Sequence, residues 1–175
     1  MKKLIMTAAI VCAVAVAKAA SVGWMSTGLS TYANDKYLFF VDGQKGASIA
    51  AVTALLDAGS SADSLSLGGG TVNAGGMMMQ GAAGSPYSLD AGTYTGFFVL
   101  FDSASPVAGT SKYTVLQGAA GLTQVIGAQA ATATFNAGAG TAVMGEWKTY
   151  GAPEPTSGVL LLLGVAGLAL KRRRA

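Results

Sequence analysis

The side chains that carry most enzyme chemistry are scarce in this 175-residue sequence. There is no histidine, and the single cysteine, Cys12, lies in an apolar N-terminal stretch. Histidine is the commonest general base and metal ligand, so its absence removes the usual serine triads and zinc sites. The sequence also lacks a nucleophile elbow, a phosphate-binding loop and a calcium loop. We therefore expect a non-enzymatic protein with no catalytic residue, no cofactor and no metal ion.

One carboxylate pair is open to a hydrolytic interpretation. Asp42 and Asp102 each follow an apolar run that is typical of a central strand. A glycosidase needs two carboxylates that face one cleft. Acidic residues at strand ends are more often solvated turn residues, and we expect this of both aspartates.

Aromatic residues suggest a second kind of site. Tryptophan and tyrosine combine an apolar ring with a polar group, which suits them to contact a polysaccharide. Most aromatic residues of a small sandwich belong to its core or rim, but Trp24 and Trp147 are the speculative glycan contacts that the sequence offers. The full set of candidate platform residues is Trp24, Tyr32, Tyr87, Trp147 and Tyr150.

Two segments predict the central strands that would position such a site. Residues 36–41 and 93–102 are apolar on both faces and rich in aromatic and β-branched residues. Such runs favour strands that are covered on both sides, so we expect them to be neighbours in one sheet. Weaker strand candidates, separated by glycine-rich breaks, are residues 21–27, 71–80, 112–117, 132–135 and 143–150.

One segment has helical rather than strand periodicity. Ile49, Val52, Leu55 and Leu56 recur at helical spacing, with Ser48 as a candidate N-cap and the following Gly59 as a stop. The pattern predicts one amphipathic helix of about ten residues that closes an open side of the sheet.

The middle of the chain, residues 20–150, is therefore predicted to be mainly β. We expect a single antiparallel sandwich or jelly-roll-like domain with one short amphipathic helix. Residues 59–70 and 136–140 are expected to be solvent-exposed connections because they are rich in glycine and small polar residues. For residues 119–131 the sequence allows two predictions, a second helix or an irregular strand pair.

The N-terminus has the three parts of a secretory signal peptide. Two lysines precede the apolar run 4–17, and Ala17, Lys18 and Ala19 form a small-x-small site. We expect cleavage between Ala19 and Ala20, so residues 1–19 are removed. Cleavage also removes Cys12, and the exported product then forms no disulfide.

The C-terminus has the pattern of a short stop-transfer segment. Residues 151–157 form a linker, and the apolar run 158–170 would span about 20 Å as a helix, against a bilayer core of about 30 Å. The basic residues after it should remain in the cytoplasm. They are Lys171, Arg172, Arg173 and Arg174.

At this end the sequence resembles the PEP-CTERM sorting signal. The match combines Pro153, Glu154 and Pro155 with an apolar stretch and a terminal basic cluster, in that order. The resemblance covers residues 153–175. It implies export by a Gram-negative type bacterium, recognition and processing by a membrane exosortase, and a surface or extracellular location. Proteins with this tail often accompany exopolysaccharide production.

The charge of the exported part excludes one class of partner. Residues 20–152 contain four lysines and seven acidic residues, which gives a net charge of −3, whereas the whole chain carries +3. Nucleic-acid binding needs a basic patch, so we expect no nucleic-acid partner.

Together these observations favour an exported, non-catalytic surface or matrix protein with a structural or adhesive role. Its expected partners are the export machinery, a membrane exosortase and the membrane itself through the C-terminal helix before processing. The alternative is a carbohydrate-binding module associated with secreted exopolysaccharide. An extracellular hydrolase that uses Asp42 and Asp102 is the third interpretation.

Overall fold

The computed structural model describes residues 19–83, 85–138 and 143–151. The sorting motif, the apolar C-terminal run and its basic residues lie outside this part, as does the signal sequence except Ala19. No helix among the described residues is long and apolar enough to cross a membrane.

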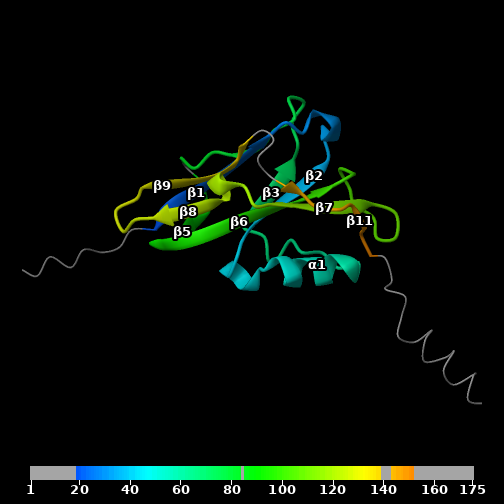
Figure 1. The fold of residues 1–175 in the computed structure, drawn as a ribbon, viewed down its shortest axis with the longest axis horizontal. Coiled ribbons are helices and arrows are strands. Elements are labelled where there is room, and N and C mark those ends of the chain that lie inside the picture. Colours follow the sequence, from blue (N-terminus) through cyan, green and yellow to red (C-terminus); the bar gives the residue numbers. More distant parts are fainter. Residues whose placement is uncertain (1–18, 84, 139–142, 152–175) are drawn as a thin grey trace, which may run out of the picture.

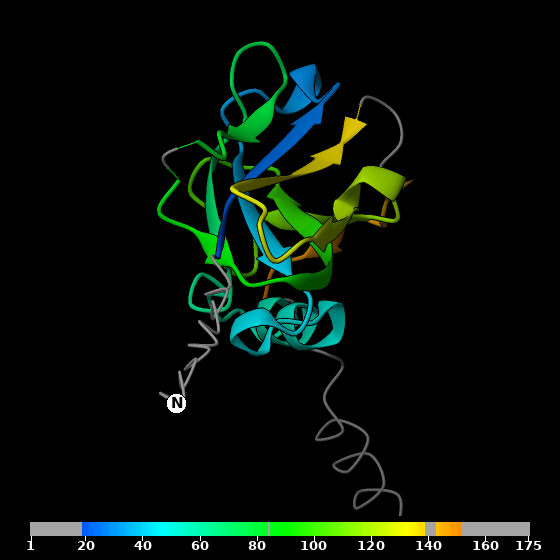
Figure 2. The ribbon, with the colours of Figure 1, turned by 90° about the vertical axis from the view of Figure 1, so that its left-hand side faces the viewer.

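The described part is mainly β, with two sheets and one α-helix, as the sequence predicts. The helix α1 (Ile49–Asp57) lies on one side of the larger sheet, and the smaller sheet lies on the other (Figures 1 and 2). The strands are β1 (Ala20–Thr27), β2 (Lys36–Val41), β3 (Gly68–Thr71), β4 (Met78–Gln80), β5 (Ser88–Leu89), β6 (Gly92–Phe101), β7 (Lys112–Gln117), β8 (Thr123–Ile126), β9 (Thr132–Ala137), β10 (Val143–Met144) and β11 (Lys148–Thr149).

The larger sheet is built around β6, its longest strand. Strand β2 pairs antiparallel with β6, with Phe39 opposite Phe98, which confirms that the two predicted central strands are neighbours. Strands β7 and β8 pair with successive parts of β6. Strand β3 extends the sheet beyond β2, and β10 and β11 extend it beyond β7.

The smaller sheet is built around β1. Strands β4 and β5 pair antiparallel with the two ends of β1. On its other edge β1 pairs with β9 in parallel, with Ser21 opposite Thr132. This parallel pair is a departure from the antiparallel arrangement that the sequence predicts.

The core has two layers because β6 is buried on both faces. Phe98 and Leu100 point toward the smaller sheet, where they join Trp24 in one cluster. Phe97 and Val99 point toward α1 and belong to a second cluster with Val52 and Leu56 of the helix. The two-sided burial predicted for residues 93–102 is confirmed for the part from Gly96 onward.

The predicted helix and both of its ends are confirmed. The Ser48 hydroxyl accepts a hydrogen bond from the Ala51 N–H at 3.1 Å, which makes Ser48 the N-cap. Gly59 has a left-handed φ of 72°, and its N–H donates to the Leu56 carbonyl at 3.0 Å. Because the Ser60 N–H bonds to the Leu55 carbonyl as well, the helix ends in a Schellman motif.

Several of the weaker predictions need correction. Residues 71–80 form no single strand: they supply the last residue of β3 and, after a loop, all of β4. Residues 143–150 likewise divide into β10 and β11. The open segment 119–131 contains a 3-10 turn at Ala120–Leu122 followed by β8. Residues 136 and 137, predicted to be a connection, are the last two of β9.

The segment 59–70 is also more structured than predicted, since it ends in β3 and buries Leu67. Close packing explains why this strand begins with glycine. A Cβ atom on Gly68 would lie 2.6 Å from Cη2 of Trp24 and 2.7 Å from the Tyr87 ring, so only glycine fits there. A Cβ atom on Gly69 would clash with the Tyr37 carbonyl oxygen of the neighbouring strand.

Candidate functional site

The structure separates the two carboxylates of the hydrolase interpretation. Asp42 follows β2 and Asp102 follows β6. Because these two strands are antiparallel, the two residues lie at opposite ends of the paired strands. Strand β2 has six residues, and at about 3.4 Å per residue its ends are about 20 Å apart. A glycosidase pair lies within about 10 Å. The two aspartates therefore do not face one cleft, and the proposed pair is wrong.

Trp24, the first speculative glycan contact, is a core residue. It is 1% exposed, and its ring stacks on Phe39 with the centroids 4.7 Å apart. Tyr87 packs against the same ring at 5.2 Å, and the Trp24 Nε1–H donates to the Tyr37 hydroxyl at 3.4 Å. Trp24 faces inward because it shares the buried face of β1 with Val22. It is not available to a glycan, and this part of the prediction is wrong.

Trp147, the second contact, lies at the rim of the same core. It is half-buried, and its ring centroid is 5.4 Å from that of the half-buried Tyr32. The Tyr32 hydroxyl donates to Sδ of Met144 at 3.9 Å. Among the five predicted platform residues the structure therefore forms two pairs, Trp24 with Tyr87 around the core and Tyr32 with Trp147 at its rim. Tyr150 is engaged elsewhere, since its hydroxyl donates to the Gly59 carbonyl at 3.1 Å.

A small hollow lies beside this aromatic pair. It has a volume of about 150 Å³, and Met144, the residue that contacts Tyr32, forms part of its wall. The wall contains residues from both sheets and none of them is charged. They are Ser26, Thr27, Gly28, Leu29, Leu116, Gly138 and Met144.

Ser26 is the residue of this hollow that sequence reasoning missed. It is 1% exposed and lies on the same face of β1 as Val22 and Trp24. The sequence does contain a signal for it: a hydroxyl residue stands at the end of an alternating apolar pattern, at a position where a buried residue is expected.

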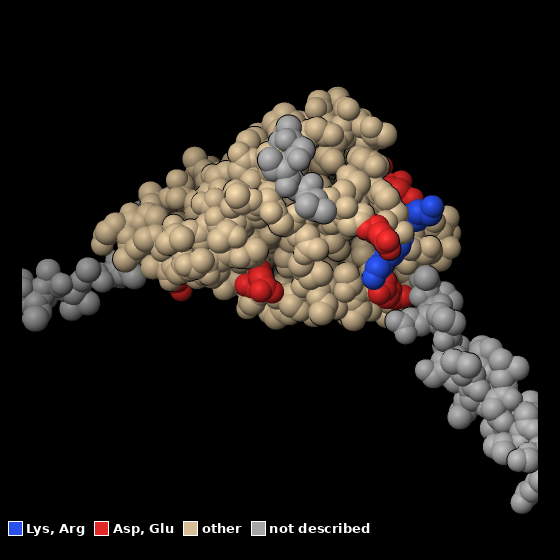
Figure 3. Space-filling view, in the orientation of Figure 1, with Lys and Arg blue, Asp and Glu red and all other residues tan. Residues whose placement is uncertain are grey.

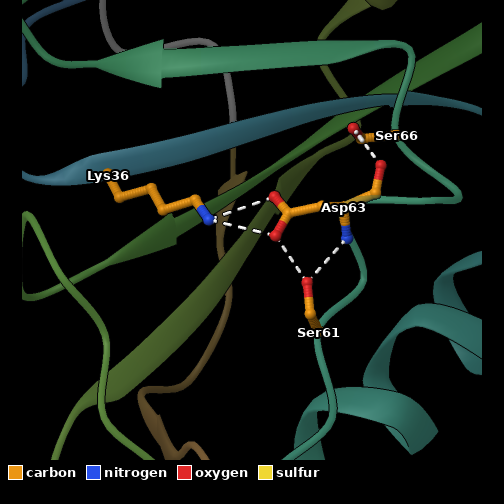
Figure 4. A network of polar contacts seen from close by, with 4 residues as sticks. All are labelled: Lys36, Ser61, Asp63 and Ser66. Atoms are coloured by element: carbon orange, nitrogen blue, oxygen red, sulfur yellow. Dashed lines mark hydrogen bonds and ion pairs between the residues drawn. The ribbon is translucent and has the colours of Figure 1, made fainter.

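A polar network joins β2 to the segment after α1 (Figure 4). The Lys36 ammonium lies 3.0 Å from Oδ1 of Asp63, and Ser61 donates a hydrogen bond to the same carboxylate. The Ser66 hydroxyl donates to the Asp63 carbonyl at 2.8 Å. Partial burial alone would raise the pKa of Asp63, but the bonds from Ser61 and Lys36 outweigh it and lower this pKa. The network holds an ionised carboxylate in place.

A part-buried contact ties α1 to the larger sheet. The Tyr113 hydroxyl donates to Oδ1 of Asp57 at 2.5 Å, and Lys148 lies 3.9 Å from the other oxygen. Burial raises the pKa of Tyr113, and the hydrogen bond to the Asp57 carboxylate raises it further. Tyr113 is therefore a neutral hydrogen-bond donor at physiological pH.

Few charged side chains reach the face shown in Figure 3. The basic groups on this face lie at one end beside several acidic ones, and further acidic groups lie along the lower edge of the view. Burial and the nearby Asp102 carboxylate both raise the pKa of Asp35. Among the described residues, no group of three or more His, Cys, Asp or Glu side chains is arranged to hold a metal ion.

The predicted processing sites lie at the limits of the described part. Ala20, expected to be the first residue after cleavage, is fully buried and is the first residue of β1. At the other end, the Gly151 N–H donates to the Leu56 carbonyl at 2.8 Å. Ala17, Pro153, Glu154 and Pro155 lie outside the described residues, as do the four basic residues 171–174.

Comparisons with known proteins leave the family open: no protein-family model, no curated protein and no solved structure matches this chain.

Proposed function

We propose that this chain is the precursor of an exported, non-catalytic protein of the cell surface or extracellular matrix. A signal peptide directs export, and a membrane exosortase recognises and processes the segment that begins at Pro153. In this proposal the segment 158–170 is a temporary membrane helix, and the β domain has a structural or adhesive role.

The observation that carries the proposal is where the described strands and contacts lie relative to the predicted processing sites. Strand β1 begins at Ala20, directly after the predicted signal-peptide cleavage site. The C-terminal end is fixed to the domain by Tyr150 and Gly151, only two residues before Pro153. Cleavage at both predicted places would therefore leave every described strand and helix intact.

The surface composition supports a structural rather than a catalytic role. The exported part has eleven charged residues, four lysines and seven acids, and many of its exposed positions are Ser, Thr, Gly or Ala. A sparsely charged surface produces little repulsion between copies and is suited to dense packing in a matrix.

The proposal is tested by a pair of triple variants expressed in a host that carries an exosortase. The test variant replaces Pro153, Glu154 and Pro155 with alanine. The control replaces the remaining two prolines and the remaining glutamate of the chain, which are Pro86, Pro106 and Glu146. We expect the test variant to stay membrane-bound with its tail, and the control to be processed like wild type. Normal processing of the test variant would refute recognition of this motif.

A second candidate function, binding of an exopolysaccharide, is favoured by one observation. Tyr32 and Trp147 form a half-buried aromatic pair next to an uncharged hollow. The candidate sugar contacts are therefore Tyr32 and Trp147 rather than the two tryptophans, because Trp24 belongs to the core.

A further inference from the structure

The hollow near Tyr32 lies at one end of the core between the two sheets. Ser26 and Thr27 are the last residues of β1, and Leu116 belongs to β7 of the larger sheet. Met144 of β10 lines the hollow, and its Sδ accepts a hydrogen bond from the Tyr32 hydroxyl at 3.9 Å. The hollow therefore lies between residues of the two sheets, and Met144 connects it to the aromatic pair.

The Ser26 hydroxyl is the polar group best placed to receive a ligand there. It makes no hydrogen bond with any described residue, although Ser26 is 1% exposed. Every fully buried side-chain nitrogen or oxygen in the described part does have a hydrogen-bond partner. The Ser26 oxygen is therefore not fully enclosed, and the residue lines the hollow. A hydroxyl in this position is able both to donate and to accept a hydrogen bond.

The composition of the wall favours an uncharged ligand with both apolar and hydroxyl surfaces. Leu29, Leu116 and Met144 supply apolar contacts, and Ser26 and Thr27 supply hydroxyl groups. Among the described residues, no lysine, arginine or carboxylate lines the hollow, so none of them would neutralise a charged group. The faces of Tyr32 and Trp147 suit the C–H faces of a pyranose ring.

The size of the hollow limits how much of a ligand it holds. Sites that enclose a small molecule usually measure about 300–1,000 Å³, and this hollow measures about 150 Å³. Only one ring or its substituents enters such a space, while the rest of the ligand lies outside along the aromatic pair. We infer that Ser26, Tyr32 and Trp147 form a subsite for a single neutral hexose unit of a polysaccharide.

This inference rests on the second candidate function, sugar binding, and is independent of C-terminal processing. It is tested by calorimetric titration of the full chain in a detergent without a sugar headgroup. The probes are cellopentaose, laminaripentaose and mannopentaose, with a pentamer of galacturonic acid as the charged counterpart. At about 20 mM, a site with a Kd of the order of 1 mM is close to saturation. We expect at least one neutral pentasaccharide to bind and the acidic pentamer not to bind.

Two substitutions assign the binding to this hollow. Trp147→Ala and Ser26→Ala should each weaken binding by about tenfold or more. Trp147→Phe should retain most of the affinity because it keeps an aromatic ring. Ser88→Ala, which removes an exposed hydroxyl on β5, is the control and should leave binding unchanged. The melting temperature of Ser26→Ala should not fall, because its hydroxyl has no protein partner to lose.

Three results would overturn the inference, and they differ in which other claim they would also refute. If no neutral pentasaccharide binds, both the subsite and the sugar-binding function are wrong. If one binds equally well to wild type, Trp147→Ala and Ser26→Ala, sugar binding stands but the site lies elsewhere. If only the acidic pentamer binds, the ligand is not a neutral hexose and the proposed ligand class is wrong.

Discussion

At the scale of single residues, the two tryptophans have different roles. Trp24 packs between Phe39 and Tyr87 in the core between the sheets, whereas Trp147 contacts Tyr32 at the rim. Trp24→Ala would leave a cavity among these rings, and we expect the free energy of unfolding to fall by about 3–5 kcal/mol. Trp147→Ala, its matched control, should lose much less. Urea denaturation of both variants measures the difference, and equal losses would contradict the assignment of Trp24 to the core.

Asp35 gives a prediction about pH. Its pKa is raised by burial and by Asp102, so its carboxylate is less stable in the folded state than in the unfolded chain. This penalty is absent below the unfolded pKa of 3.8, where both states are protonated, and is complete above the folded pKa. Asp35→Asn cannot ionise and should therefore be more stable than wild type at pH 7, by a few tenths of a kcal/mol after solvent screening. Denaturant titrations should show this gain disappearing near pH 3, and a gain of the same size at both pH values would argue against the charge explanation.

The sequence contains part of the information on which residues are buried. Val22, Trp24 and Ser26 alternate along β1, and this period-2 pattern indicates that Trp24 points inward. Ser26 breaks the apolar pattern, and only the packing of both sheets around it shows that it lines a hollow. Tyr32 and Trp147 were both candidate platform residues, but no pattern singled out this pair. The two residues are far apart in the chain, Tyr32 in a 3-10 turn and Trp147 between β10 and β11.

At the scale of elements, a single side chain stabilises the start of helix α1. Ser48 caps the helix through its hydroxyl, which accepts from the Ala51 N–H. Ser48→Ala should lower the free energy of unfolding by about 1 kcal/mol, with a range of about 0.5–2 kcal/mol. Ser48→Asp, which keeps a capping oxygen, should restore most of the loss. Thermal or urea denaturation of the two variants checks this, and equal stability of Ser48→Ala and wild type would mean that packing alone fixes the helix start.

Strand β3 depends on the absence of side chains at its start. A Cβ atom at Gly68 would lie within 3 Å of the Trp24 and Tyr87 rings, so Gly68→Ala must displace an aromatic ring. We expect a loss of about 1–3 kcal/mol, the usual cost of overpacking a core. Gly81→Ala is the control, because a Cβ there meets nothing within 4 Å and φ is not positive. If urea denaturation shows the same stability for both variants, the close packing of β3 is not a determinant of stability.

The elements with a strong apolar pattern were the ones that the sequence predicted well. Strands β2 and β6 are continuous apolar runs and helix α1 has helical periodicity, and each lies close to its expected range. Strand β3 was missed because its glycine run has no hydrophobic pattern, and its strand geometry depends on pairing with β2. The parallel pairing of β1 with β9 joins segments more than 100 residues apart, and no local pattern encodes it.

At the scale of the whole molecule, the fold accounts for how the chain would tolerate processing at both ends. Ala20 is held in β1, opposite Leu89 of β5. At the C-terminal end, the Tyr150 carbonyl accepts from the Gly109 N–H at 2.6 Å, and Gly151 donates to Leu56. A cut within residues 152–157 would therefore leave these contacts in place.

The central claim is that this chain is a precursor trimmed at both ends, and the intact mass of the native protein tests it most directly. The protein should be recovered separately from the medium and from the membranes of its native host. We predict that the mature form begins at Ala20 and ends between Gly151 and Gly158, without the apolar run and the basic residues. A mature membrane form that still contains Leu170 and Arg174 would contradict the account, because the C-terminal segment would then be a permanent anchor rather than a processing signal.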